Sequence, residues 1–231
     1  MLTWARYHAR RMIYRSHALR RLAERHTHIL NPSEWDQHLA TDKSTYLGGT
    51  VSIDARNSLL ATLIKHYGHP RPKVLDVGCA GGSLAASLAA SIDYDEYFGV
   101  DISSVAIAQA QSHYGARPAT RFTVSSLQDF EPSESPWNVI VLGGVLYYLP
   151  VDEAAAQVDR YAKALLPDGL ICISMKDDGK SQQIYRSLHS LTLREALLIQ
   201  AKISLDDLDY RIRVDRARPA YLIAAFARAL T

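Results

Sequence analysis

The stretch that decides the fold is KVLDVGCAGGSLAASL, residues 73–88. It passes from apolar residues through the carboxylate of Asp76 into a glycine-rich segment, and then into small and apolar residues that favour a helix. This order predicts a buried strand, a tight loop and the N-terminus of a helix. Glycines let the backbone turn sharply and approach a ligand, and the start of a helix offers free N–H groups. The stretch therefore predicts a site for a nucleotide-like ligand.

The composition is that of an ordinary globular protein. The chain has 231 residues, of which 48% are hydrophobic and 22% charged, enough for one domain with a short extension. The two cysteines, Cys79 and Cys172, are too few for a disulfide framework and are expected to be reduced thiols. Because no long apolar run or secretion signal is visible, we expect a cytoplasmic protein that does not span a membrane.

The charge is concentrated at one end of the chain. Residues 1–30 hold seven of the 26 basic residues and one of the 24 acidic residues, so this segment carries +6 and the remainder −4. An acidic body argues against a nucleic-acid partner, because phosphate neutralisation dominates such binding. Residues 2–26 read as a basic helix with an aromatic stripe. This helix either contacts an anionic membrane surface or an acidic partner, or packs over the ligand crevice with its arginines in solvent.

Strands and helices alternate through the rest of the chain. Strands are predicted at residues 73–77, 97–100, 121–124, 138–142 and 170–175, with helices at 83–91, 103–114, 152–166 and 181–201. Two last strands, 210–214 and 220–226, are joined by a short turn and must be antiparallel. The sequence thus predicts an α/β fold, a doubly wound sheet of seven mostly parallel strands with one reversed strand and helices on both faces.

The region before the sheet is predicted to be helical. One helix is expected over residues 34–42, capped by Ser33, and another over residues 54–68. We therefore divide the chain into residues 1–60, a basic helix with a helical lid, and residues 61–231, a domain that holds the ligand.

The glycine loop discriminates between two classes of cofactor. A dinucleotide fingerprint has three glycines in the pattern G-x-G-x-x-G, whereas Ala80 and Ser83 stand at its second and third positions. Asp76 precedes the first glycine by two residues, where an acid gains nothing from a pyrophosphate but attracts a ligand with an ammonium group. S-adenosylmethionine carries such a group, so it fits this loop better than a nicotinamide dinucleotide does.

The segment DVGCAGGSL resembles the first motif of the class I S-adenosylmethionine-dependent methyltransferases, D/E-x-G-x-G-x-G, with Ala80 at the middle glycine. The resemblance implies cofactor contacts from the loop, from an acid that binds both ribose hydroxyls, from an apolar residue that packs on the adenine, and from the regions after the third and fourth strands. In the order of the chain these residues are Asp76, Gly78, Cys79, Ala80, Gly82, Asp101, Ile102, Ser126, Leu127 and Leu142.

The resemblance continues beyond the glycine loop, with one departure at Ser126. Ser126 stands where the family usually has an acid that accepts from the adenine amine, and Leu127 would supply a backbone N–H to the ring. The stretches NVIVLGGVLYYLP (138–150) and LLPDGLICIS (165–174) are similar to the family's fourth and fifth strands. Within the family, GCAGGS and GVLYYL are similar to the nodulation-factor N-methyltransferases, which act on a chito-oligosaccharide amine.

Further residues are candidates outside these motifs. Arg56 either binds the carboxylate of the methionine moiety or is an ordinary helix-surface arginine. The acceptor side has four candidates, and no general base is assigned among them: His38, Tyr46, Tyr147 and Tyr148. We expect no metal, since Gly143 and Gly144 stand where the metal-dependent subgroup of the family has acids.

The resemblance implies methyl transfer to an N or O atom of a small-molecule or sugar-like acceptor. An amine acceptor needs only to arrive unprotonated, whereas a hydroxyl needs a base. Two alternatives stay open. The chain could be a non-catalytic methyltransferase-like scaffold that binds an acidic partner or a membrane surface. Less favoured is a NAD-dependent oxidoreductase.

Overall fold

The computed structural model describes residues 19, 31–41, 51–132, 135–176, 178–199 and 221–228. Two helices precede the sheet, α3 (Pro32–Thr41) and α4 (Val51–Tyr67), where helices were expected. Asn31 rather than Ser33 caps α3, because its Oδ1 accepts from the Glu34 N–H at 3.0 Å while Glu34 Oε2 accepts from the Asn31 N–H at 2.8 Å. Apart from Leu19, the predicted basic helix over residues 2–26 lies outside the described residues.

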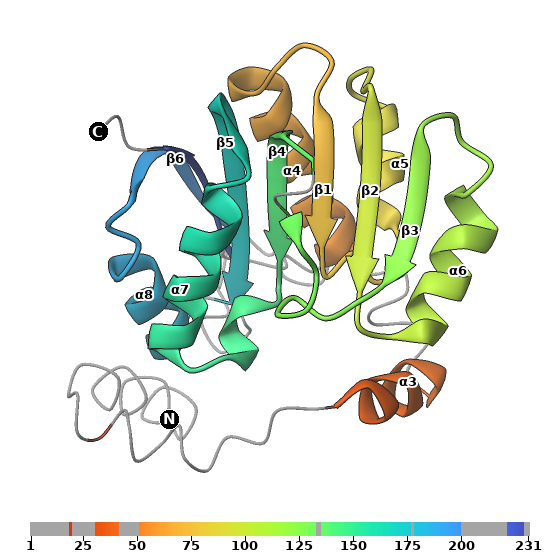
Figure 1. Cartoon of the computed structure of the whole chain (residues 1–231), viewed down its shortest axis with the longest axis horizontal. Helices are drawn as coiled ribbons and strands as arrows, with labels where there is room; N and C mark the ends of the chain where they lie inside the picture. Colours follow the sequence, from red (N-terminus) through yellow and green to blue (C-terminus); the bar gives the residue numbers. More distant parts are fainter. Residues whose placement is uncertain are drawn as a thin grey trace, which may run out of the picture.

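Seven strands form one sheet in the order β3-β2-β1-β4-β5-β7-β6 (Figure 1). The strand β7 runs antiparallel to both β5 and β6, and the other pairs are parallel, which confirms the predicted fold class. The strands are β1 (Lys73–Val77), β2 (Glu96–Asp101), β3 (Thr120–Val124), β4 (Trp137–Gly143), β5 (Leu165–Lys176), β6 (Leu191–Ile199) and β7 (Tyr221–Arg228).

Helices cover both faces of the sheet. After the glycine loop come α5 (Ser83–Ala89), α6 (Ser104–Tyr114), the short 3₁₀ helix η2 (Leu146–Tyr148), α7 (Val151–Ala162) and α8 (Gly179–Arg186). The helices α4 and α5 pack on one face, and α7 and α8 on the other. The central strands read as continuous apolar runs because their side chains are buried on both sides.

Two expectations about helices were wrong. The helix predicted over residues 181–201 is the shorter α8 followed by the strand β6, and the helix predicted to reach residue 166 ends at Ala162. Pairing with β7 accounts for the first difference, because it aligns residues 191–199 with the antiparallel strand from Arg228 to Tyr221. The strand predicted at residues 210–214 lies outside the described residues, so the described sixth strand is β6.

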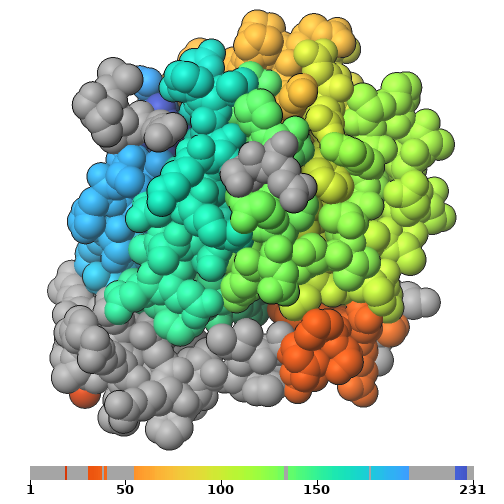
Figure 2. Space-filling model, in the orientation of Figure 1, coloured from red at the N-terminus to blue at the C-terminus, as the bar shows by residue number. Residues whose placement is uncertain are grey.

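The strand order reverses between β1 and β4, which are neighbours in the sheet although β2 and β3 separate them in sequence. In open sheets of this type a ligand binds at the carboxyl ends of the strands where the order reverses. The glycine loop follows β1 at that edge. The helix α3 lies below the same edge, next to the start of α6 (Figures 1 and 2).

Candidate cofactor-binding site

The glycine loop after β1 is a tight turn bonded to the neighbouring strand. The N–H groups of Gly78 and Cys79 both donate to the carbonyl oxygen of Val100, at 2.7 and 3.1 Å. Gly78 has a φ of 78°, and a Cβ added there would lie 2.1 Å from Val145 Cγ1. Only glycine therefore fits at this position without moving the segment that follows β4.

Ala80 also takes a left-handed backbone conformation, with a φ of 46°, and Gly82 follows with a φ of 78°. The family motif has glycine at both positions. The chain thus retains the loop shape although Ala80 carries a Cβ, at a conformational cost of about 1 kcal/mol.

The carboxylate of Asp76 is buried at the end of β1. It accepts a hydrogen bond from Tyr97 Oη at 2.5 Å. Burial raises the pKa of Asp76 to about 6, although the hydrogen bond from Tyr97 and the positive charge of Arg56 oppose this rise. A carboxylate in such surroundings gains from a cation nearby, which suits it to a ligand with an ammonium group.

Asp101 ends β2 and ties the loop to the start of α6. Its Oδ2 accepts from the Ala80 N–H and its Oδ1 from the Ser103 N–H, each at 2.9 Å. Burial raises the pKa of this carboxyl, while the two backbone donors hold it down. Since a carboxylate has about four acceptor positions, two remain for hydroxyl groups of a ligand.

A pocket of about 440 Å³ opens beside Asp101, between β3 and the start of α3. Its lining combines apolar surface with polar groups: Pro32, Ile102, Val124, Ser125, Ser126, Gln128 and Asp129. Ile102 and Ser126, predicted as adenine contacts, are thus brought together here.

Asp129 is a pocket residue that the sequence reasoning missed. Ser126 Oγ donates to Asp129 Oδ2 at 2.6 Å and accepts from the Asp129 N–H at 3.0 Å. A carboxylate thus lies three residues after Ser126, on the same turn of the pocket wall. The spacing S-x-x-D, which predicts a side-chain-capped turn, was the available signal.

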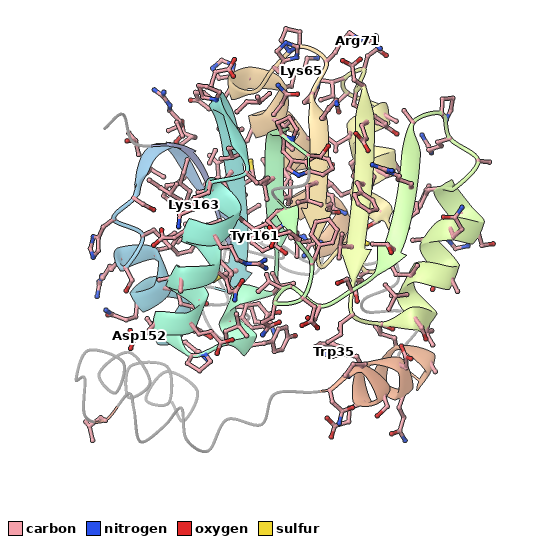
Figure 3. The ribbon with its side chains drawn as sticks, viewed as in Figure 1. Trp35, Lys65, Arg71, Asp152, Tyr161 and Lys163 are labelled. Carbon is pink, nitrogen blue, oxygen red and sulfur yellow. The ribbon has the colours of Figure 1, made fainter. Side chains whose placement is uncertain are left out.

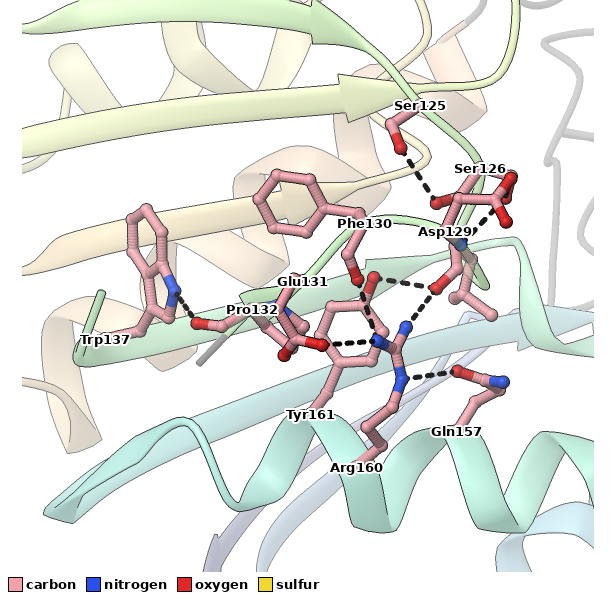
Figure 4. A network of polar contacts seen from close by, with 11 residues as sticks. Ser125, Ser126, Asp129, Phe130, Glu131, Pro132, Trp137, Gln157, Arg160 and Tyr161 are labelled. Atoms are coloured by element: carbon pink, nitrogen blue, oxygen red, sulfur yellow. Dashed lines mark hydrogen bonds and ion pairs between the residues drawn. The ribbon is translucent and has the colours of Figure 1, made fainter. Parts of the chain in front are cut away.

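Leu127 lies between two pocket residues but does not line the pocket itself. Its side chain packs against the main core cluster, and its carbonyl oxygen accepts from Arg160 and Tyr161 of α7 (Figure 4). The proposed contact of its N–H with adenine stays a prediction. Leu142 is fully buried in β4 and belongs to the same core cluster.

Arg56 extends from α4 toward the end of β4. Its Nε and Nη2 donate to Asn57 Oδ1 at 3.2 and 3.1 Å, and Asn57 in turn donates to Ser83 Oγ at 2.8 Å. A Cβ added at Gly144 would lie 3.5 Å from Arg56 Nη1 and 3.7 Å from Tyr147 Oη. The guanidinium and the phenol therefore converge over the residue that follows β4.

Aromatic rings gather next to this point, on the acceptor side of the crevice. Tyr147 and Tyr148 are both half-buried, with ring centroids 4.4 Å apart, and Tyr147 Oη donates to Tyr148 Oη at 3.2 Å. Trp35 reaches from α3 to Tyr148, edge to face at 5.1 Å (Figure 3). Lys176 places its Nζ 5.6 Å from the centre of the Tyr147 ring. Tyr147 also packs against the main core cluster.

The remaining residues predicted for the site are His38 and Tyr46, on the acceptor side, and the thiol Cys79. His38 lies on α3, but its side chain, like all of Tyr46, is outside the described residues. Cys79 is buried, and burial together with the carboxylates of Asp76 and Asp101 raises the pKa of its thiol well above the ordinary value. Cys79 therefore stays protonated and contributes its backbone to the loop.

The helix α3 is fastened to the start of α6 by one carboxylate. Asp36 accepts from the hydroxyl groups of Ser103 and Ser104 and, at 3.2 Å, from the N–H of Val105. These donors hold the pKa of Asp36 below its ordinary value. Because Pro32 of α3 lines the pocket, this attachment also positions one pocket wall.

Within the described ranges, no cluster of three or more His, Cys, Asp or Glu side chains suitable for a metal ion is present. None of the described helices is long and apolar enough to cross a membrane.

Part of the chain is similar to known methyltransferases. Residues 75–171 match the model of a family described as a methyltransferase domain. Among solved structures, the chain is similar to the N-methyltransferase NodS from Bradyrhizobium japonicum WM9 in complex with S-adenosyl-L-homocysteine. The TM-score is 0.69 and the identity 19%, over 86% of this chain and 98% of that one. At this identity the likeness shows the fold.

Curated relatives match over shorter stretches. The carboxy-S-adenosyl-L-methionine synthase of Chromohalobacter salexigens is 30% identical over 106 residues, 45% of this chain and 39% of the relative. The trans-aconitate 2-methyltransferase of Acidovorax sp. is 27% identical over 131 residues, 55% of this chain and 48% of the relative. The matched part spans between a quarter and about half of the length of the curated relatives.

Proposed function

We propose that the chain is a class I methyltransferase, which binds S-adenosylmethionine and transfers its methyl group to an N or O atom of a small-molecule or sugar-like acceptor. The observation that carries this proposal is the convergence of Asp76, the glycine loop, Asp101 and the pocket at Ile102 on one edge of the sheet.

The residues of the crevice fit the parts of this cofactor. Asp76 would accept from the ammonium group, and Arg56 would pair with the carboxylate of the methionine moiety. Asp101 has two acceptor positions left for the ribose hydroxyls. Ile102 and Val124 supply apolar surface for the adenine.

When bound, the cofactor supplies a methyl group on a positively charged sulfur. The protein's part is to hold the acceptor atom in line with that methyl group and to exclude water, and this positioning can provide most of the acceleration. The aromatic rings of Trp35, Tyr147 and Tyr148 support an acceptor with apolar ring faces, as sugars and planar metabolites have. Because the Tyr147 hydroxyl and the Arg56 guanidinium both lie close to Gly144, we assign Tyr147 a positioning role toward the acceptor.

Two relatives guide the choice of acceptors. NodS is an N-methyltransferase, and another relative is named for methylation of trans-aconitate. A panel with chito-oligosaccharide amines and carboxylate-bearing metabolites, incubated with methyl-labelled S-adenosylmethionine, therefore tests both acceptor chemistries. Labelled product from any member supports methyl transfer, and the position of the label identifies the atom. Binding of cofactor without any transfer across the panel would favour the non-catalytic scaffold.

The ribose contact gives a direct test of the site. Because Asp101 would accept from both ribose hydroxyls, Asp101→Ala should weaken binding of S-adenosyl-L-homocysteine more than tenfold in a calorimetric titration. Its melting curve, recorded alongside, separates loss of the ligand contact from loss of the fold. An unchanged affinity in the folded variant would place the ribose elsewhere.

A further inference from the structure

The turn between β3 and β4 is held from outside the pocket by two side chains of α7. Arg160 Nη2 and Tyr161 Oη both donate to the carbonyl oxygen of Leu127, at 2.5 and 3.0 Å (Figure 4). Arg160 Nη1 also donates to the carbonyl oxygen of Phe130 at 2.8 Å. Three hydrogen bonds to backbone oxygens thus fix a segment of four residues.

The guanidinium that makes two of these bonds is itself fixed. Arg160 Nε donates to Gln157 Oε1 at 3.0 Å, and its Cζ lies 4.9 Å from the centre of the Tyr161 ring. Glu131 adds a carboxylate oxygen 3.9 Å from Nη1. Burial raises the pKa of Tyr161 to about 12, so its phenol remains a donor at neutral pH. An oriented guanidinium loses little further freedom when it holds a carbonyl.

Because the peptide bond is planar, holding the Leu127 carbonyl also fixes the direction of the Gln128 N–H. In a planar trans peptide the C=O of one residue and the N–H of the next point in opposite directions. Since α7 draws the Leu127 carbonyl toward itself, the N–H of Gln128 faces the other way. Gln128 lines the pocket beside Ile102 and Val124. Within the described residues, no backbone oxygen accepts from this N–H.

We propose that Arg160 and Tyr161 are positioning residues that orient the peptide between Leu127 and Gln128, so that the Gln128 N–H donates to ring nitrogen N1 of the adenine. This assignment rests on the proposed function, and it adds a donor at Gln128 to the backbone donor expected at Leu127. Neither α7 residue touches the cofactor, because their donors point at the far side of the peptide. Arg160 and Tyr161, which lie outside the pocket, would thus determine its selectivity for adenine.

The test measures discrimination rather than affinity alone. Calorimetric titration with S-adenosyl-L-homocysteine and with its 1-deaza analogue, in which a C–H replaces N1, gives the ratio of the two dissociation constants. The wild-type chain should bind the natural ligand at least tenfold more tightly, as expected for one buried hydrogen bond. In Arg160→Met the ratio should fall at least threefold, because only the Tyr161 hydroxyl then holds the Leu127 carbonyl.

Milder variants and a matched control complete the design. Tyr161→Phe and Arg160→Lys each keep part of the restraint and should give intermediate ratios, even if Arg160→Met folds poorly. Arg71→Met removes an arginine at the opposite end of the sheet and should leave the ratio unchanged (Figure 3). A wild-type ratio in a folded Arg160→Met would overturn the inference, as would equal binding of both compounds by the wild type. Failure of the wild type to bind either would overturn the proposed function instead.

Discussion

At the scale of single residues, Ala80 combines a side chain with a backbone conformation that suits glycine. Its φ is 46°, between two glycines at 78°. The left-handed region is disfavoured for residues with a Cβ, and β-branched residues tolerate it least. The N–H of Ala80 donates to Asp101, which holds the loop in this shape.

We predict that two substitutions at Ala80 differ in their effect on stability. Ala80→Gly should change the free energy of unfolding by less than about 1 kcal/mol, because relief of strain is offset by the greater freedom of the unfolded chain. Ala80→Val should lower it by about 1–3 kcal/mol. Denaturant titration of both variants and of the wild type measures these free energies of unfolding. Equal stabilities would show that the loop does not hold the left-handed conformation.

The buried carboxyl of Asp76 predicts a pH dependence of cofactor binding. Its pKa is about 6 in the free protein, and only the ionised form attracts an ammonium group. The apparent dissociation constant of S-adenosyl-L-homocysteine should therefore rise as pH falls, and be about tenfold higher at pH 5 than at pH 8. Titration calorimetry across this range measures the effect. Asp76→Asn should bind more weakly and lose most of the dependence, whereas an unchanged dependence in that variant would assign it to another group.

The same carboxyl affects stability with the opposite sign. Because its pKa is raised from 3.8 in the unfolded chain to about 6, the folded state holds its proton more tightly. Asp76 therefore makes the free protein lose stability as pH rises from about 4 to about 6. Denaturant titrations of the wild type should show this fall, and Asp76→Asn should reduce it. A difference between the two proteins that does not vary with pH would contradict this assignment.

Residues that follow strands were the most predictable part of the site. Asp76, Gly78 and Asp101 stand at the ends of β1 and β2, where the strand pattern and the glycines locate them. Asp129, Arg160 and Trp35 could not be found in this way. Their roles depend on contacts between segments far apart in sequence, or on a turn whose side chains look like ordinary surface residues.

At the scale of elements, α3 is attached mainly through Asp36 and the buried Leu39, which packs with Ala106. Asp36 accepts from the start of α6 much as a capping residue does. The attachment places Pro32 at the pocket and Trp35 against Tyr148. Asp36 and Leu39 therefore link the position of α3 to one wall of the pocket.

Asp36→Ala should detach this helix. We expect a loss of about 1 kcal/mol in the free energy of unfolding, and about fivefold weaker binding of S-adenosyl-L-homocysteine because one pocket wall is loosened. Hydrogen exchange should become faster in residues 32–41. Asp93→Ala, which removes an exposed acid facing Arg71, is the matched control. Unaltered exchange in α3 would show that other contacts hold the helix.

The strand β6 shows where local patterns mislead. The residues LREALLI have high helix propensity, and a helix was predicted through them. In the structure they pair with β7, with a register shift between Leu193 and Glu195 that breaks the alternation of strand residues. Pairing with a strand more than twenty residues further along outweighs the local preference, and a single sequence does not reveal such a partner.

At the scale of the whole molecule, the alternation of strands and helices predicted the parallel strands of the sheet and β7, whereas β6 lies where a helix was predicted. It also predicted the reversed strand, because two final strands without a crossover helix must be antiparallel. The division into a lid of residues 1–60 and a domain of residues 61–231 stays a prediction. The helix α4 crosses that boundary and packs directly on the sheet. The role of the basic segment over residues 2–26 likewise remains as predicted from its sequence.

The central claim is that the crevice at the end of β1 holds S-adenosylmethionine. Calorimetric titration of the purified chain with S-adenosyl-L-homocysteine and, separately, with NADH tests it most directly. We expect micromolar binding of S-adenosyl-L-homocysteine at pH 8 and no measurable binding of NADH. Binding of NADH alone, or of neither compound, would contradict it.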